Sequence, residues 1–353
     1  MRKSPLAIRP ADILAVDRSA IDLTKPTIGL AIVLVALILF STVGPFGFTA
    51  AIGAVLAVAF DGGGPRRRRL AVLGVFGVLG ALATYLGNSA LSSMGGSIVV
   101  VFIVTLLCGM ALAFGPYAGK MAFFLNLWTL IALSLATVID APLALALGFL
   151  CGAGAAAVLL IAKQAAPEEA AAAPAWTLAP LRTHLSLRSP ILHFALSRAV
   201  IAAFAMWLGW AIAPAHPYWI AMTFLIVLVP DRAQAARTSW QRAIGTIIGV
   251  ALAGFILGLG LTPTTLLLVW LLVILIMLAV QGVNYVLYAS ILTLCLLLLY
   301  QLLEADVLFN GMERLVTTLL GIGLALGVVA LLEYLARRDA GGQTAAARGE
   351  IDN

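Results

Sequence analysis

The sequence predicts an all-α protein that crosses a membrane about twelve times. Of its 353 residues, 63% are hydrophobic and 10% are charged, whereas a soluble domain carries about 25% charged residues. The apolar residues come in runs of about 15 to 23, the length needed to cross a bilayer core of roughly 30 Å. No run alternates with a period of two, so transmembrane helices are predicted and not barrel strands.

The predicted spans form two halves of six helices. The first half, 26–162, contains spans at 26–43, 46–60, 70–87, 97–114, 120–139 and 142–162. The second half, 191–335, contains spans at 191–213, 216–230, 241–261, 264–280, 283–303 and 312–335. Spans 46–60 and 216–230 are the shortest and hold corresponding places, and each is introduced by proline. Such paired, interrupted segments point to a transport site, with a tight hairpin turn as the alternative.

The segments outside the spans are polar or basic. Residues 1–25 predict a cytoplasmic amphipathic elbow that lies on the membrane surface. Residues 163–190 predict an Ala/Pro-rich cytoplasmic linker that ends in a second basic elbow. Residues 336–353 are expected to form a disordered cytoplasmic tail.

The distribution of charge predicts the orientation of the chain. Lys and Arg gather in alternate loops, including Arg66 to Arg69, and only Arg314 lies on the opposite side. This asymmetry predicts a multi-pass protein of a bacterial inner membrane with cytoplasmic N- and C-termini. The tetrad Arg66 to Arg69 is interpreted as a topology anchor, with binding of anionic membrane lipids as the alternative. The net charge of +6 therefore indicates no nucleic-acid partner.

No motif for catalysis or metal binding is present. The three cysteines lie within apolar spans, and the three histidines have no metal-ligand spacing. The sequence has no GxGxxG, no Walker loop and no Ser/His/Asp set. We therefore expect no enzymatic activity, no metal and no cofactor.

Two levels of internal repeat follow from the sequence. Asp61 and Asp231 each close the second helix of their half, and Gly148 and Gly321 sit alike in the last helix. Because six is an even number, the two halves are predicted to be parallel, related by a pseudo-two-fold axis along the membrane normal.

A second repeat is detectable within the second half. Residues 242–253 read RAIGTIIGVALA and residues 314–325 read RLVTTLLGIGLA. Residues 218–223 match 288–293 more weakly. The copies lie three helices apart, an odd number, so the sequence predicts an inverted three-helix repeat, as in secondary transporters.

Candidate anion-binding residues recur in this repeat. Arg242 and Arg314 each stand at the predicted N-terminal end of a helix, and are followed by Thr246 and by Thr317 with Thr318. Unpaired N–H groups and the helix dipole favour an anion beside such an arginine. These residues are therefore candidates for substrate binding.

Structural alternatives stay open for these and for three further candidates. Arg242 could be another topology anchor, and Arg314 could pair with one of its acidic neighbours, which are Glu304, Asp306 and Glu313. Arg198 could line an anion path or snorkel to the surface. Trp219 could stack on a substrate ring or belong to an aromatic belt. Asp231, with Asp61, is the candidate for proton coupling, and a helix cap is the alternative.

The second half resembles a known transporter family through motifs spread over 191–335. They are Tyr218-Trp219, Thr223, Pro230-Asp231, Arg242-x-x-Gly245-Thr246-x-x-Gly249 and Arg314-x-x-Thr317-Thr318-x-x-Gly321. This pattern resembles the fusaric acid resistance and aromatic acid exporter family. The resemblance implies an inner-membrane efflux permease for aromatic carboxylic acids, teamed with a periplasmic membrane-fusion adaptor and an outer-membrane channel. Thr223 joins the candidate substrate-binding residues on this basis.

The first half departs from the family pattern. Position 49 is Thr where the second half has Trp219, and no Arg-x-x-Gly-Thr motif follows Asp61. The chain also has only the short linker where larger family members place a sizeable cytoplasmic domain. We expect a minimal secondary-active exporter of small organic, aromatic carboxylate anions. The alternatives are an anion channel, formed by a homo-oligomer, and a non-transporting subunit of a membrane complex.

Overall fold

The computed structural model describes most of both predicted halves. The described residues are 34, 38, 43–61, 66–90, 93–136, 139–162, 184–186, 189–228, 232–280, 283–303 and 311–331. The elbow at 1–25, nearly all of the linker at 163–190, the tail at 336–353 and Asp231 lie outside them. Seven of the described helices are long and apolar enough to cross a membrane, and four shorter apolar helices accompany them. Because the predicted span 26–43 is largely outside the described residues, the total of twelve stays a prediction.

Eleven predicted spans coincide with a described helix. In the first half these are α3 (Pro45–Phe60), α4 (Arg66–Ala90), α5 (Met94–Met110) with the short η2 (Ala111–Phe114), α6 (Pro116–Leu135) and α7 (Pro142–Ala162). In the second half they are α9 (Pro190–Ile212), α10 (Tyr218–Val227), α11 (Arg232–Gly258), α12 (Pro263–Ala279), α13 (Tyr285–Leu303) and a final helix, Gly311–Leu331.

Local sequence explains where many of these helices begin. Five of them, namely α3, α6, α7, α9 and α12, start with proline. Proline suits the first helical position because its ring presets φ and no N–H is needed there. Helix α5 begins instead after Ser93, whose hydroxyl accepts a hydrogen bond from the Gly96 N–H at 3.0 Å.

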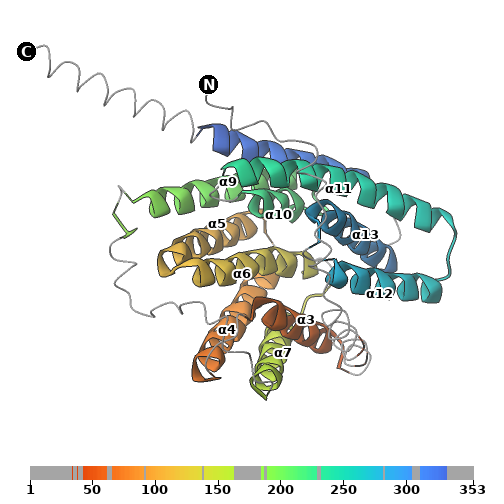
Figure 1. The fold of residues 1–353 in the computed structure, drawn as a ribbon, viewed down its shortest axis with the longest axis horizontal. Coiled ribbons are helices and arrows are strands. Elements are labelled where there is room, and N and C mark those ends of the chain that lie inside the picture. Colours follow the sequence, from red (N-terminus) through yellow and green to blue (C-terminus); the bar gives the residue numbers. More distant parts are fainter. Residues whose placement is uncertain are drawn as a thin grey trace, which may run out of the picture.

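Three apolar cores hold the helices together. One core joins α3, α4, α6 and α7, and a second joins α11, α12 and α13. The third joins α5 and α6 of the first half to α9, α10 and the final helix of the second half. Figure 1 shows this arrangement, with α5 and α6 between the α3–α4–α7 group and the α9–α10–α11 group. The two halves therefore share a core and are not separate bundles.

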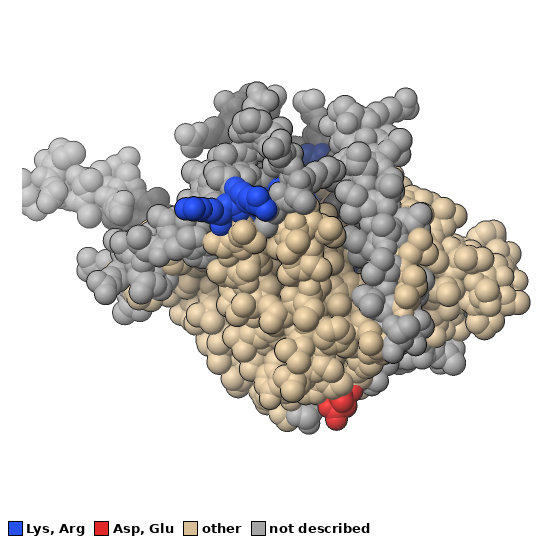
Figure 2. All heavy atoms as spheres, turned by 90° about the horizontal axis from the view of Figure 1, so that it is seen from below, with Lys and Arg blue, Asp and Glu red and all other residues tan. Residues whose placement is uncertain are grey.

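The outer surface suits a lipid environment. Large apolar side chains such as Val158, Leu159 and Phe255 are about two-thirds or more exposed. Figure 2 shows Lys and Arg side chains toward one end of the visible face and an acidic side chain at the opposite end, with uncharged surface between them. Such a broad apolar surface on a soluble protein would be an interaction or aggregation site. The chain is therefore a multi-pass helical membrane protein.

Helix α10 is much shorter than a membrane crossing. Its 10 residues rise about 15 Å, roughly half of the bilayer core. Eight of the 10 residues are buried, and α10 packs against α6, α9 and α11. The sequence predicted the shortest crossings at 46–60 and 216–230, and the helix found within 216–230 is shorter still than the predicted span. Irregular backbone at its ends is tolerated in a membrane because protein surrounds it.

Candidate functional site

Arg242 is fully buried on α11 without a charge partner in the described structure. Its relative exposure is 0%, and its Nε, Nη1 and Nη2 atoms make no hydrogen bond of normal geometry to a described residue. It lies on the buried face of α11 together with Ala235, Ser239 and Thr246. The Tyr285 phenol on α13 makes a polar contact with its guanidinium, and the Tyr288 phenol of the same helix interacts with it electrostatically. Arg242, Tyr285 and Tyr288 form what we call the arginine–tyrosine cluster.

The predicted helix N-terminus at Arg242 is wrong. Helix α11 begins at Arg232, so Arg242 lies well inside the helix and its backbone N–H is engaged. The hydropathy pattern marks where α11 becomes apolar, whereas 232–241 is rich in Ala, Arg and Gln, which also favour helix. The guanidinium side chain therefore carries any anion site here, without help from a helix end.

Arg314 stacks on a buried tryptophan of α10. Its relative exposure is 1%, and its guanidinium carbon lies 5.0 Å from the centre of the Trp219 ring. Trp219 itself is 2% exposed. A cation over an indole face is a favourable geometry. The structure therefore brings together two of the sequence-predicted residues, from α10 and from the final helix.

A histidine and a glutamate that were not among the predicted site residues complete this group. The His216 ring stacks on Trp219 with centroids 4.1 Å apart and an interplanar angle of 9°. Its Nδ1 lies 3.1 Å from the Glu313 carboxylate, and both side chains are buried. His216 precedes the Tyr218-Trp219 motif by two residues, and Glu313 directly precedes Arg314. This closeness to predicted site residues is the sequence feature that could have identified them. His216, Trp219, Glu313 and Arg314 form what we call the arginine–tryptophan cluster.

Buried threonine hydroxyls lie on the same helices. The side-chain oxygens of Thr223, Thr246, Thr318 and also Thr293 have no hydrogen-bond partner within the described part of the chain. Thr317 differs, because its hydroxyl donates to the Glu313 carbonyl at 2.7 Å. Thr317 therefore has a local helix partner, while the other four offer buried donors for a ligand.

Two glycines of the predicted inverted repeat make corresponding contacts. A Cβ on Gly249 of α11 would lie 2.7 Å from the Thr293 Cβ of α13, and a Cβ on Gly321 would lie 2.8 Å from the Thr223 Cβ of α10. Each glycine thus lets its helix approach one of the buried threonines closely. The matching residue types, at the shifts of the predicted repeat, support it without showing the direction of the copies.

The first half repeats one of these contacts. A Cβ on Gly148 of α7 would clash with Thr49 and with the Phe46 carbonyl of α3, just as Gly321 approaches Thr223. By contact, therefore, Thr49 corresponds to Thr223, whereas the sequence comparison had placed it opposite Trp219. At this point the first half therefore has the same glycine–threonine packing as the second half, but its sequence has no tryptophan at the position that corresponds to Trp219.

Arg198 points into the protein from α9. It is 7% exposed, and its guanidinium donates to the Leu225 carbonyl of α10 at 3.4 Å. This inward position does not fit the snorkelling alternative. This bond links α9 to α10, and the buried Nε of Arg198 has no hydrogen-bond partner among the described residues.

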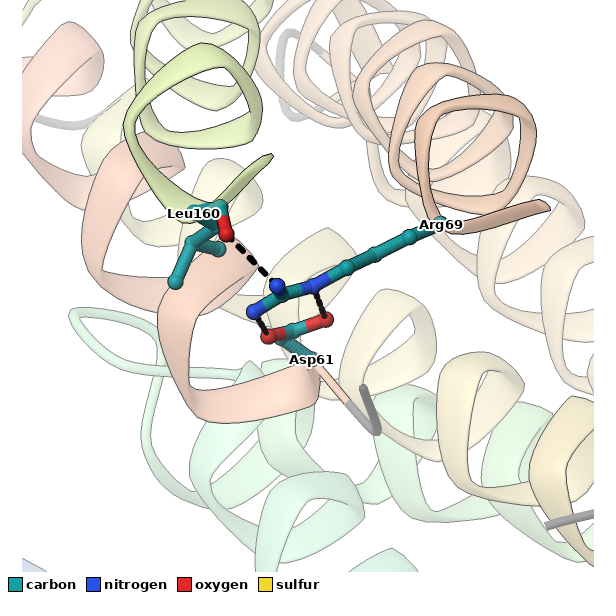
Figure 3. A network of polar contacts seen from close by, with 3 residues as sticks. All are labelled: Asp61, Arg69 and Leu160. Atoms are coloured by element: carbon teal, nitrogen blue, oxygen red, sulfur yellow. Dashed lines mark hydrogen bonds and ion pairs between the residues drawn. The ribbon is translucent and has the colours of Figure 1, made fainter. Parts of the chain in front are cut away.

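Asp61 belongs to an ion pair that was not predicted. Its carboxylate accepts from Nε of Arg69 at 2.7 Å and from Nη2 of the same guanidinium, and Nη1 of Arg69 donates to the Leu160 carbonyl of α7 at 2.5 Å. Figure 3 shows the guanidinium and the carboxylate edge to edge, joined by two contacts, with Leu160 at the end of α7 beside them. Arg69 is buried in this pair, which does not fit the alternative of lipid binding for the last member of the Arg66 to Arg69 tetrad, while its role as a topology anchor stays a prediction. We assign Asp61 a structural role, while Asp231 lies outside the described residues.

The fold defines a class of protein: a multi-pass helical membrane protein, with several buried arginines among its described residues. Residues 199–328 match the family described as fusaric acid resistance protein-like. The resemblance stated from the sequence is thereby confirmed for this segment, which holds Trp219, Arg242 and Arg314. Curated proteins and solved structures gave no match.

Proposed function

We propose that the protein moves small aromatic carboxylate anions across the inner membrane by secondary-active efflux. The observation that carries the proposal is Arg242, a fully buried guanidinium whose neighbours among the described residues include tyrosine phenols but no carboxylate partner. A charge held inside a membrane protein without compensation is costly and is typical of a functional site. A carboxylate matches a guanidinium in charge and in bidentate geometry.

The two clusters supply the rest of a site for such an anion. Thr246 lies one turn after Arg242 and Thr318 one turn after Arg314, and both hydroxyls are buried without a described partner. The phenols of Tyr285 and Tyr288 interact with Arg242. Trp219 already contacts Arg314 and His216, so its role is to position these groups, in place of the direct stacking on substrate expected from the sequence.

Transport is favoured over a purely structural role by the short α10 and by the family match. A half-length helix enclosed by protein is the construction found at the sites of many secondary transporters. The matched family is described by resistance to an aromatic acid. A periplasmic membrane-fusion adaptor and an outer-membrane channel are the partners that this resemblance implies. Asp231 remains the sequence candidate for proton coupling.

The test is efflux of labelled benzoate from proteoliposomes with an imposed pH gradient, an imposed voltage or neither. We expect flux that follows the pH gradient and falls at least about tenfold in Arg314→Gln, because a charge-assisted contact is lost. Arg66→Gln, which removes an exposed arginine, is the matched control. Flux that follows voltage alone would indicate the anion channel. No flux for benzoate or related aromatic acids would instead favour a non-transporting subunit.

A further inference from the structure

A buried guanidinium and a buried amide, each with a donor left over, lie where the two halves of the chain meet. Arg198 of α9 is 7% exposed. Its Nη2 donates to the Leu225 carbonyl of α10 at 3.4 Å, and its Nε has no hydrogen-bond partner among the described residues. Asn126 of α6 is 1% exposed, and its Nδ2 likewise has no partner in the part of the chain that the structure describes. Buried polar atoms are nearly always hydrogen-bonded, so these two donors need an explanation.

Both side chains approach the same turn of α5. The Asn126 Oδ1 accepts a hydrogen bond from the Thr105 hydroxyl of α5 at 3.1 Å. The Cys108 thiol, three residues further along α5, interacts electrostatically with the Arg198 guanidinium. Residues three apart are neighbours on the surface of a helix. An amide from the first half and a guanidinium from the second half therefore meet α5 at the same level.

The packing of α9 against α5 gives the same placement. The Trp210 indole N–H donates to the Ser97 hydroxyl at 2.9 Å, and a Cβ on Gly109 would lie 2.7 Å from the Ala195 Cβ. The two helices are thus antiparallel, because the later residue of α5 meets the earlier residue of α9. Arg198, one turn after Ala195, must then lie level with the turn of α5 that precedes Gly109, which is the turn described above.

The surroundings of Arg198 are apolar and contain no described counter-charge. Val101 of α5, Ala202 of α9 and Leu225 of α10 belong to the core that joins the two halves. Among the described residues, no carboxylate forms an ion pair with Arg198. A guanidinium N–H and an amide N–H are both donors, so the ligand that matches them is a negatively charged acceptor such as a carboxylate.

We propose that Arg198 and Asn126 form a second binding site for the transported carboxylate anion, between the two halves of the chain. The proposal rests on the proposed function, which supplies the ligand. The Arg198 Nε and the Asn126 Nδ2 donate to the carboxylate, and the surrounding apolar core holds the ring. Because the Leu225 carbonyl engages part of the guanidinium, this site is weaker than the site at Arg242. The first half thereby takes part in binding, although that half lacks the arginine motif of the second half.

The experiment counts the benzoate molecules that the full-length protein binds in lipid nanodiscs, by equilibrium dialysis of labelled benzoate. Empty nanodiscs measure the benzoate that dissolves in the lipid. The test variants are Arg198→Met, Arg198→Lys and Asn126→Leu. The matched controls are Arg237→Met, at an exposed arginine, and Asn88→Leu, at a buried amide that donates to the Ile139 carbonyl at 2.9 Å. Thermal unfolding checks that each variant is folded.

We expect wild type to bind two benzoates at saturation, a tighter one at Arg242 and a weaker one at Arg198. Arg198→Met should bind the tighter one alone, with unchanged affinity. Arg198→Lys should weaken the second site about tenfold, because lysine keeps the charge and loses the planar set of donors. Asn126→Leu should weaken it about fivefold or more through the loss of one donor. Both control variants should bind two benzoates as wild type does.

The outcomes separate this inference from the proposed function. A wild type that binds one benzoate, with that binding lost in Arg242→Met, would overturn the second site and leave the proposed function in place. Two benzoates of unchanged affinity in Arg198→Lys and Asn126→Leu would place the weaker site elsewhere and overturn the inference as well. These two milder variants decide the point even if Arg198→Met fails to fold. No benzoate binding at all would overturn the proposed function and the second site together.

Discussion

The two halves of the chain treat a buried arginine in opposite ways. In the first half, Arg69 is held by the Asp61 carboxylate and by the Leu160 carbonyl. In the second half, Arg242 is fully buried, and its neighbours among the described residues include tyrosine phenols but no carboxylate partner. Buried charges are normally paired. The first arrangement therefore connects α4 to the ends of α3 and α7, and the second is the reason for our proposal that Arg242 binds a ligand.

The threonines follow the same division. Thr84 of the first half accepts from the Trp128 indole N–H at 2.7 Å and donates to the Gly80 carbonyl at 2.7 Å. Thr223 of the second half is equally buried and has no described partner. Thr84 therefore connects α4 to α6, whereas the buried Thr223 hydroxyl makes no such connection among the described residues.

The largest expected effect is on the stability of the first half. Asp61→Asn removes the charge partner of a buried arginine and should lower the free energy of unfolding by about 3–5 kcal/mol. The measurement is reversible unfolding in mixed detergent micelles. Asp140→Asn, at an exposed carboxylate, should leave stability unchanged.

A double variant sharpens this prediction. Asp61→Asn with Arg69→Met removes both charges, so most of the lost stability should return. If Asp61→Asn alone unfolds like wild type, the Asp61–Arg69 pair does not stabilise the first half. The two halves would then not differ in the structural role of their buried arginines.

Arg242 should respond in the opposite way. Arg242→Met replaces an unpaired buried charge by an apolar side chain, so the free energy of unfolding should stay equal or rise. Affinity for benzoate should nevertheless fall about 10- to 100-fold, as expected for the loss of a charge-assisted contact. Binding in nanodiscs and unfolding in micelles measure the two effects separately.

The exposed Arg237 on the same helix provides the control for Arg242. Arg237→Met should change neither benzoate affinity nor stability. A marked loss of stability in Arg242→Met would show that the arginine is a structural element like Arg69, and would remove the main observation behind the proposed function.

Much of the helical arrangement could be predicted because membrane crossing imposes a long apolar run on each helix. The starts of helices were less accessible, and α11 begins nine residues before the predicted span because its first turns are polar. The sequence contains a pattern from which the inward position of Arg69 could have been predicted. It precedes Val72, Leu73 and Phe76 at helical spacing, and these three are buried.

The candidate site was predictable only in part. The repeat pointed to Arg242 and Arg314, since like residues recur at one shift. It could not reveal that Tyr285 faces Arg242 or that His216 meets Glu313, because these contacts join helices far apart in the sequence. Such tertiary contacts depend on helix rotation and crossing, which a single sequence does not encode in any local pattern.

The smallest expected effect is a difference in stability between variants of two threonines, one with hydrogen-bond partners and one without a described partner. Thr84→Val leaves the buried Trp128 N–H without an acceptor and should cost about 1–2 kcal/mol of stability. Thr223→Val keeps the shape and removes a hydroxyl that has no described partner, so stability should stay equal or rise slightly. Parallel unfolding curves of the two variants measure the difference. Equal losses would mean that Thr223 is hydrogen-bonded within the folded protein, and the distinction between connecting and ligand-facing threonines would then fail.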